Sequence, residues 1–116
     1  MAMSNDSNRQ YVAWKDSKGN HVLWFRGGSR GTLSTPDGWE PDEQAYDWGN
    51  MSNATCRLAS ALITNLYSED KDCLHDKTEY FFAREFLMSF PDGWGIHENI
   101  MRCMIEAADI IARIAR

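Results

Sequence analysis

The spacing of apolar side chains changes once along this chain, and that change constrains the fold more than any other feature. Between Gln10 and Arg26, β-branched and aromatic residues are interspersed with polar ones in a pattern typical of strands. From Asn53 onward, apolar residues recur every three or four positions, which is the period of an amphipathic helix. The 116 residues have the length of one domain. We therefore predict a single α+β domain over residues 10–116, preceded by a disordered tail over residues 1–9.

The N-terminal strands are predicted to form an antiparallel hairpin. Its strands are Gln10–Lys15 and His21–Arg26, and the segment between them contains Gly and Asn, which favour a turn. Residues 27–45 are interrupted by Gly and Pro and predict a loop, with a short strand near Thr32–Ser34. The expected sheet is thus a hairpin or three strands packed against the helices.

Three helices are predicted in the second half, over residues 53–67, 77–89 and from 98 to the C-terminus. Each has an apolar stripe that can pack onto a core. Asp76 and Glu79 have the spacing of a capping box at the start of the second helix. Two tryptophans are expected to anchor the connecting loops to the core: Trp48 and Trp94.

The last helix is apolar over more than one face. Its main stripe consists of Ile100, Met101, Met104, Ile105, Ala108, Ile111, Ala112 and Ala115. A second stripe at heptad spacing consists of Cys103, Ala107, Ile110 and Ile114. Arg102–Glu106 and Asp109–Arg113 are expected to pair on the polar side. Such a helix is either central in the fold or covered by a partner, and a homodimer through it is one expectation.

The second helix has a smaller surplus of apolar side chains. Phe81 and Met88 share a side with Arg84 and Glu85, opposite the main stripe. They either pack under the N-terminal hairpin or form an exposed pair of the kind found at interfaces. The candidate partner-binding residues are Phe81, Arg84, Glu85, Met88, Cys103, Ile110 and Ile114.

The residues that carry chemistry match no catalytic or metal-binding motif. The nearest local pair is Cys73-Leu-His75, and a small enzyme would need Asp47, His21, His97 or a cysteine to converge. We predict no catalytic residue, metal or cofactor. Three widely spaced cysteines behind a polar N-terminus favour a reducing cytoplasm, and no apolar run has the length of a membrane span.

The charge distribution disfavours a broad nucleic-acid interface. The net charge is −5, and residues 40–99 carry twelve acidic against four basic side chains. The exception is Arg26-Gly-Gly-Ser-Arg-Gly31, where two arginines and exposed backbone amides could hold an anion. The alternative function is therefore nucleic-acid or anion binding through Arg26 and Arg30.

Three ordered motifs resemble those of an uncharacterised family of small phage and bacterial proteins, a domain of unknown function. They are Tyr46-Asp-Trp-Gly49, the helix containing Leu58-Ala-Ser-Ala-Leu62, and Phe90-Pro-Asp-Gly-Trp94 followed by Ile96. The match spans about residues 46–105 and departs from the pattern at Asn50-Met-Ser-Asn53, where the family has glycines.

The resemblance implies no known activity, but it implies that the chain is an accessory protein of a phage or mobile genetic element. Small accessory proteins of phages and mobile elements often act stoichiometrically on host proteins, including defence complexes such as a CRISPR effector. We therefore expect a non-enzymatic interaction protein that binds a host protein or itself, in the host cytoplasm if it is phage-encoded.

Overall fold

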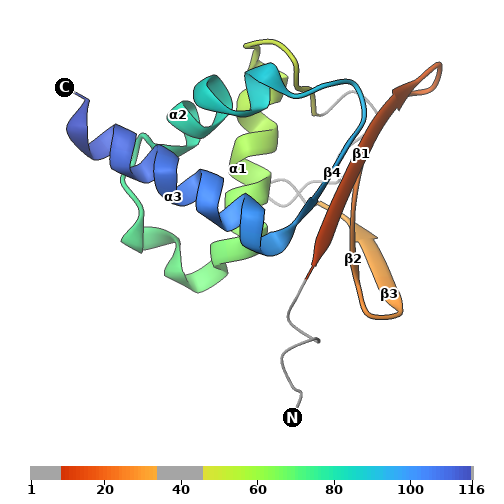
Figure 1. The fold of residues 1–116 in the computed structure, drawn as a ribbon, viewed down its shortest axis with the longest axis horizontal. Helices are drawn as coiled ribbons and strands as arrows, with labels where there is room; N and C mark the ends of the chain where they lie inside the picture. Colours follow the sequence, from red (N-terminus) through yellow and green to blue (C-terminus); the bar gives the residue numbers. More distant parts are fainter. Residues whose placement is uncertain (1–8, 34–45, 116) are drawn as a thin grey trace.

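The computed structural model describes residues 9–33 and 46–115, and it has two layers (Figure 1). One layer is an antiparallel sheet with strands β1 (Gln10–Asp16), β2 (Gly19–Arg26), β3 (Ser29–Thr32) and β4 (Trp94–His97). The other layer contains α1 (Asn53–Tyr67), α2 (Thr78–Glu85) and α3 (Glu98–Ile114), with 3-10 turns η2 (Ser68–Cys73) and η3 (Leu87–Ser89). The predicted α+β class is confirmed.

The sheet has a fourth strand from the helical half of the chain. The strand order is β3-β2-β1-β4, so β1 lies between its hairpin partner and a strand that follows α2. Tyr11 pairs with Trp24 on one side and with Ile96 on the other. The sequence indicated only a brief extended segment at 94–96, because nothing local to it identifies a pairing partner so far away along the chain.

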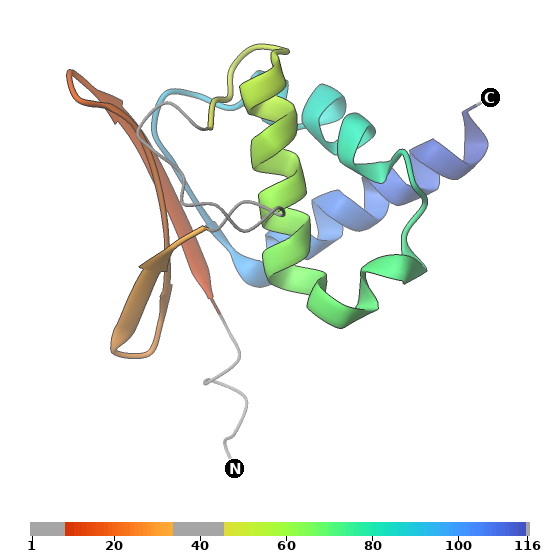
Figure 2. The ribbon, with the colours of Figure 1, turned by 180° about the vertical axis from the view of Figure 1, so that it is seen from behind.

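All three helices lie on one side of the sheet, as both views show (Figure 1, Figure 2). Alternate residues of a strand face opposite sides, and Tyr11, Ala13 and Val22 are the buried, helix-facing set. The core between the layers is completed by Trp48, Leu58, Leu62, Phe82, Leu87, Met101 and Ile105, all fully buried. The predicted bounds of α1 are confirmed, with Ser52 accepting a hydrogen bond from the Thr55 amide at its N-terminus.

The second helix is shorter than predicted. It ends at Glu85, where Phe86 departs from helical geometry (φ −125°, ψ −62°), and the chain continues as η3. The predicted capping box is wrong, because Asp76 contacts the His75 ring and Glu79 accepts a hydrogen bond from Ser60 on α1. A contact between helices replaces the local one.

Two expectations for the last helix are wrong and one is confirmed. Arg113 pairs with Asp109 at 2.9 Å, as predicted. Arg102 pairs with Glu98 rather than Glu106, because its guanidinium also donates to the Leu66 carbonyl at the C-terminal end of α1. Ile100 was assigned to the buried stripe, but it is 55% exposed.

The glycine-rich segment after Arg26 is a tight turn between two strands and not an open loop. Gly27 takes φ +60°, and Arg26 pairs directly with Ser29 across the turn. Two positions further on, Gly31 lies opposite Trp24, and a Cβ at Gly31 would come within 2.7 Å of the indole ring. The absence of a side chain at Gly31 therefore allows Trp24 to lie across β3.

We predict that Gly31→Ala lowers the free energy of unfolding by about 1–3 kcal/mol, because the new methyl group displaces the Trp24 ring. The matched control is Gly28→Ala, where an added Cβ meets nothing within 4 Å, and which we expect to change stability by less than about 0.5 kcal/mol. Urea denaturation of both variants measures the difference. Equal losses would show that Trp24 does not require this glycine.

Candidate functional site

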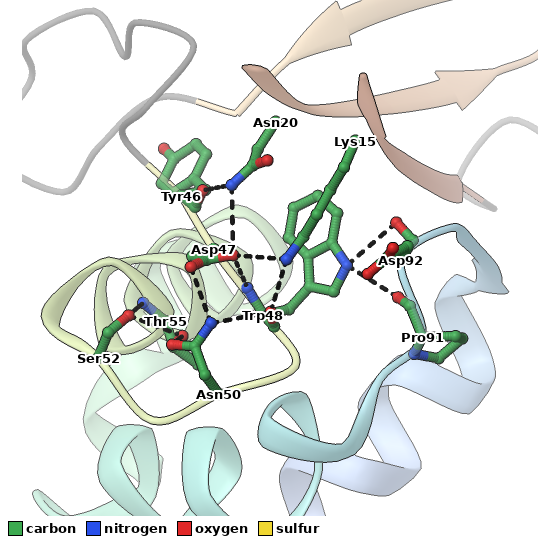
Figure 3. A network of polar contacts seen from close by, with 10 residues as sticks. All are labelled: Lys15, Asn20, Tyr46, Asp47, Trp48, Asn50, Ser52, Thr55, Pro91 and Asp92. Carbon is green, nitrogen blue, oxygen red and sulfur yellow. Dashed lines mark hydrogen bonds and ion pairs between the residues drawn. The ribbon is translucent and has the colours of Figure 1, made fainter. Parts of the chain in front are cut away.

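The Tyr46-Asp-Trp-Gly49 segment joins the sheet to the helices through the Asp47 carboxylate (Figure 3). Its Oδ1 lies 2.8 Å from Lys15 Nζ on β1 and accepts from Asn20 on β2 at 3.2 Å. Its Oδ2 accepts from Asn50, just before α1, at 2.8 Å. One side chain thus ties two strands to the start of the first helix.

The environment of Asp47 stabilises its charged form. Partial burial by itself would raise the pKa of this carboxyl, but hydrogen bonds from Lys15, Asn50 and the Trp48 amide together hold the pKa below its ordinary value. These contacts occupy both carboxylate oxygens. We therefore interpret Asp47 as a structural group and not as a general base.

Trp48 joins the two Trp-containing motifs. Its ring is fully buried, and its Nε1 donates to the carbonyls of Pro91 and Asp92 at 2.8 and 3.2 Å (Figure 3). Its ring packs edge-on against Trp94 with centroids 5.9 Å apart. The motif at 46–49 and the motif at 90–94 are therefore two halves of one junction.

We predict that Asp47→Asn lowers the free energy of unfolding by about 1–3 kcal/mol at neutral pH, because a charged acceptor of several hydrogen bonds is lost. The stabilisation by the carboxylate is present above the ordinary aspartate pKa and disappears as pH falls through its lowered value. The difference in the free energy of unfolding between wild type and Asp47→Asn should therefore become smaller at acidic pH.

Chemical denaturation at neutral and acidic pH measures that gap. Asp92→Asn is the matched control, because the Asp92 side chain is exposed. We expect this control to match wild type at both pH values. A gap for Asp47→Asn that stays constant with pH would contradict the role assigned to its charge.

The outer face of the sheet carries an apolar patch that the sequence analysis did not identify. By strand alternation, Val12, Trp14, His21, Leu23 and Phe25 face away from the helices, and we call them the outer sheet patch. Among the described residues, no helix lies on this side (Figure 1, Figure 2). Trp14 is 37% exposed and the other four are half-buried beside one another. The sequence of β2 contains an indication of this patch. In His21-Val-Leu-Trp-Phe25, the residues that face one side of the sheet and those that face the other side are both apolar.

One end of the outer sheet patch is held in place by local contacts. The Trp14 and His21 rings stack with centroids 4.8 Å apart. Asp16 accepts from both rings, at 3.0 Å from His21 Nε2 and 3.3 Å from Trp14 Nε1. The hydrogen bond with His21 is the main reason that the pKa of Asp16 is lowered. Gly95 lies opposite Val12 and adds no side chain, which leaves this part of the face flat.

The candidates on the second helix do not lie under the hairpin. α2 is separated from the N-terminal strands by α1 in both views (Figure 1, Figure 2). Phe81 is half-buried and packs against the helical core, while Met88 is 40% exposed on η3. Arg84 and Glu85 are exposed neighbours with a 3.8 Å ion pair. Because the helix ends before Met88, the seven-residue spacing no longer places Met88 beside Phe81.

The candidate partner-binding residues on the last helix share one exposed face. Cys103, Ile110 and Ile114 are exposed along α3.

The two arginines proposed to bind an anion do not meet. Arg30 on β3 pairs with Phe25, whereas Arg26 is one position further along β2, so the two arginine side chains point to opposite faces of the sheet. The expected two-arginine anion clamp does not form.

The groups considered for catalysis are also far from one another. His21 lies on the outer face, whereas Asp47 contacts Lys15 and Asn20 on the inner face. The His97 ring accepts a hydrogen bond from the Asn99 amide at the start of α3. Burial raises the pKa of the Cys56 thiol, and Cys73 and Cys103 are exposed. Within residues 9–33 and 46–115, no three His, Cys, Asp or Glu side chains are grouped to hold a metal.

Comparison with protein-family models, curated proteins and solved structures gives no match. In the described part of the chain, no helix combines the length and apolarity that a membrane span requires.

Proposed function

We propose that this chain acts by binding another protein through the outer sheet patch. The observation that supports this proposal is an apolar sheet face with no helix of the described chain over it, opposite a face whose Tyr11, Ala13 and Val22 are buried in the core. Apolar patches of this kind, rimmed by polar groups, are typical of interaction surfaces. Here the rim includes Gln10, Asp16 and Arg30.

The composition of the patch suits a protein partner. Trp and Phe provide large contact areas with few rotatable bonds, and aromatic anchors dominate the energetics of protein interfaces. The Trp14–His21 stack and its hydrogen bonds to Asp16 reduce the side-chain entropy that binding would cost. Such a patch needs no ordering of a loop before it engages a partner.

The resemblance noted in the sequence directs the choice of partner. We carry forward the expectation of a phage or mobile-element accessory protein, so host complexes, defence complexes included, are the first class of partner to test. In this proposal the chain acts stoichiometrically and has no catalytic step.

We expect Trp14→Ala and Phe25→Ala each to weaken capture of the partner by at least about tenfold, because central aromatic anchors contribute most of the binding free energy. Tagged protein captures partners from host lysate, mass spectrometry identifies them, and titration with the purified partner measures affinity. Tyr80→Ala, an exposed aromatic on α2, is the matched control and should bind as wild type does.

Thermal unfolding must first show that each variant is folded. If Trp14→Ala and Phe25→Ala are folded and bind as tightly as wild type, the outer sheet patch is not the interface. If Tyr80→Ala alone abolishes capture, the helical layer binds the partner instead.

A second candidate function is binding of single-stranded nucleic acid on the same face. The observation that favours it is the register, which places Arg30 directly opposite Phe25 on the side that carries the Trp14–His21 stack. Exposed aromatics beside an arginine on an open sheet can stack bases and hold phosphate. This function predicts quenching of tryptophan fluorescence by oligonucleotides that weakens with salt and with Arg30→Ala. No quenching at low salt would exclude it.

A further inference from the structure

An uninterrupted apolar stripe runs along α3 on the side away from the core. Its members are Ile100, Cys103, Ala107, Ile110 and Ile114, and we call it the α3 seam. The steps between them are three, four, three and four residues, which is the heptad pattern of a coiled coil. The sequence predicts Ile100 in the main, core-facing stripe, but the structure places it on the outer side. It therefore adds a fifth member to the second stripe, which was predicted to have four.

The α3 seam faces outward while the opposite side of the same helix is buried. Ile110 is 58% exposed and Ile114 70% exposed, whereas Met101, Ile105 and Ala108 are fully buried. No other element of the described chain passes in front of α3 in Figure 1. A helix that is apolar on two opposite sides satisfies only one of them within this protomer.

We propose that the α3 seam binds a second copy of this chain, with the two α3 helices antiparallel. Ala107 of one copy packs against Ile110 of the other, and Cys103 packs against Ile114. The twofold axis repeats each contact, which makes four layers. This proposal uses a different surface from the outer sheet patch and does not depend on it.

Charge selects this register. Glu106 and Arg113 flank the α3 seam on one side, at the heptad positions that meet each other in an antiparallel pair. In the proposed register, Glu106 of each copy faces Arg113 of the other, so the flanking charges are complementary on both sides of the axis. Arg113 donates through Nε to Asp109 and through Nη2 to the Cys73 carbonyl, and neither of these contacts uses Nη1, which points to it as the donor to the second copy.

The competing arrangements lack this complementarity. Shifting the antiparallel pair by one heptad brings Glu106 against Glu106 of the second copy in one direction and Arg113 against Arg113 in the other, and both contacts are repulsive. A parallel pair places Glu106 beside Ile111 of the second copy and Cys103 against Cys103. Only the proposed register pairs opposite charges and also buries Ile110 and Ile114.

The proposed contact is short, so the dimer should be weak. The overlap runs from Cys103 to Ile114, which is eleven residue steps or about 17 Å of helix. A single pair of helices of this length buries less surface than a standard stable interface. We therefore expect a dimer whose population rises with protein concentration.

Cross-linking tests the register. In a background with the exposed Cys73 replaced by Ser, Ile114→Cys places a new thiol against Cys103 of the second copy. Mild oxidation should then produce a covalent dimer, whereas the background protein, whose one exposed cysteine among the three is Cys103, should form no disulfide-linked dimer. Ile100→Cys is the matched control, because in this register position 100 lies past Ile114, the last residue of α3 in the second copy, and far from its Cys103, so it should not cross-link. Efficient cross-linking through Cys103 alone would indicate the parallel pair and overturn the proposal.

The mass in solution tests the seam itself. Light scattering of wild type should give a weight-average mass that rises from one chain toward two with concentration. Ile110→Glu, which places charge in two central layers, should give the mass of one chain throughout. Ile100→Glu is equally exposed and lies outside the overlap, so it should still dimerise. Circular dichroism checks that both variants are folded.

Two results would overturn the proposal: a wild-type mass of one chain at every concentration, or a dimer that survives Ile110→Glu. Because Trp14→Ala and Phe25→Ala leave the α3 seam unchanged, they should not alter the mass. Failure of the proposed protein-binding function and failure of this dimer are thus separate outcomes.

Discussion

The junction around Asp47 and Trp48 is the constraint on which the rest of the structure depends. A fully buried indole donates its only N–H to backbone carbonyls at 91 and 92, and the neighbouring carboxylate binds Lys15 and Asn20 on the first two strands. These contacts link the segment that precedes α1 and the segment that follows η3 to the sheet. They also place Trp94 at the start of β4, so that the last strand can pair with β1. Both oxygens of the Asp47 carboxylate and the Trp48 indole N–H make their contacts within the chain itself.

The two-layer arrangement that follows from this junction leaves surfaces that the core cannot use. Helices on one face of a sheet bury only that face, and a strand as apolar as β2 places large side chains on both. The outer sheet patch is therefore a consequence of layering and of the composition of β2 together. The same reasoning applies to α3, which is buried on one side by the other helices and carries the α3 seam on the other.

The two surfaces differ in the partner that they suit. The outer sheet patch is broad, flat and aromatic, and it includes a stacked Trp–His pair with a fixed carboxylate at its rim. The α3 seam is narrow, aliphatic and flanked by one acidic and one basic residue in complementary order. A second copy of the chain matches the second pattern because a twofold axis brings Glu106 to Arg113 twice. The two proposals are compatible, because self-association through the α3 seam would leave the outer sheet patch uncovered.

The sequence alone determined the α+β class, the N-terminal hairpin, the whole of α1 and the Asp109–Arg113 pair, because each depends on residue spacing within one element. Tertiary structure decided what depends on contacts between distant segments. Leu66 on α1 draws Arg102 away from the pairing with Glu106, and Ser60 takes Glu79 out of a local cap. The partner of β4, the early end of α2 and the outward position of Ile100 were decided in the same way. Periodicity shows that a face is apolar, but only packing shows which apolar faces the protomer covers.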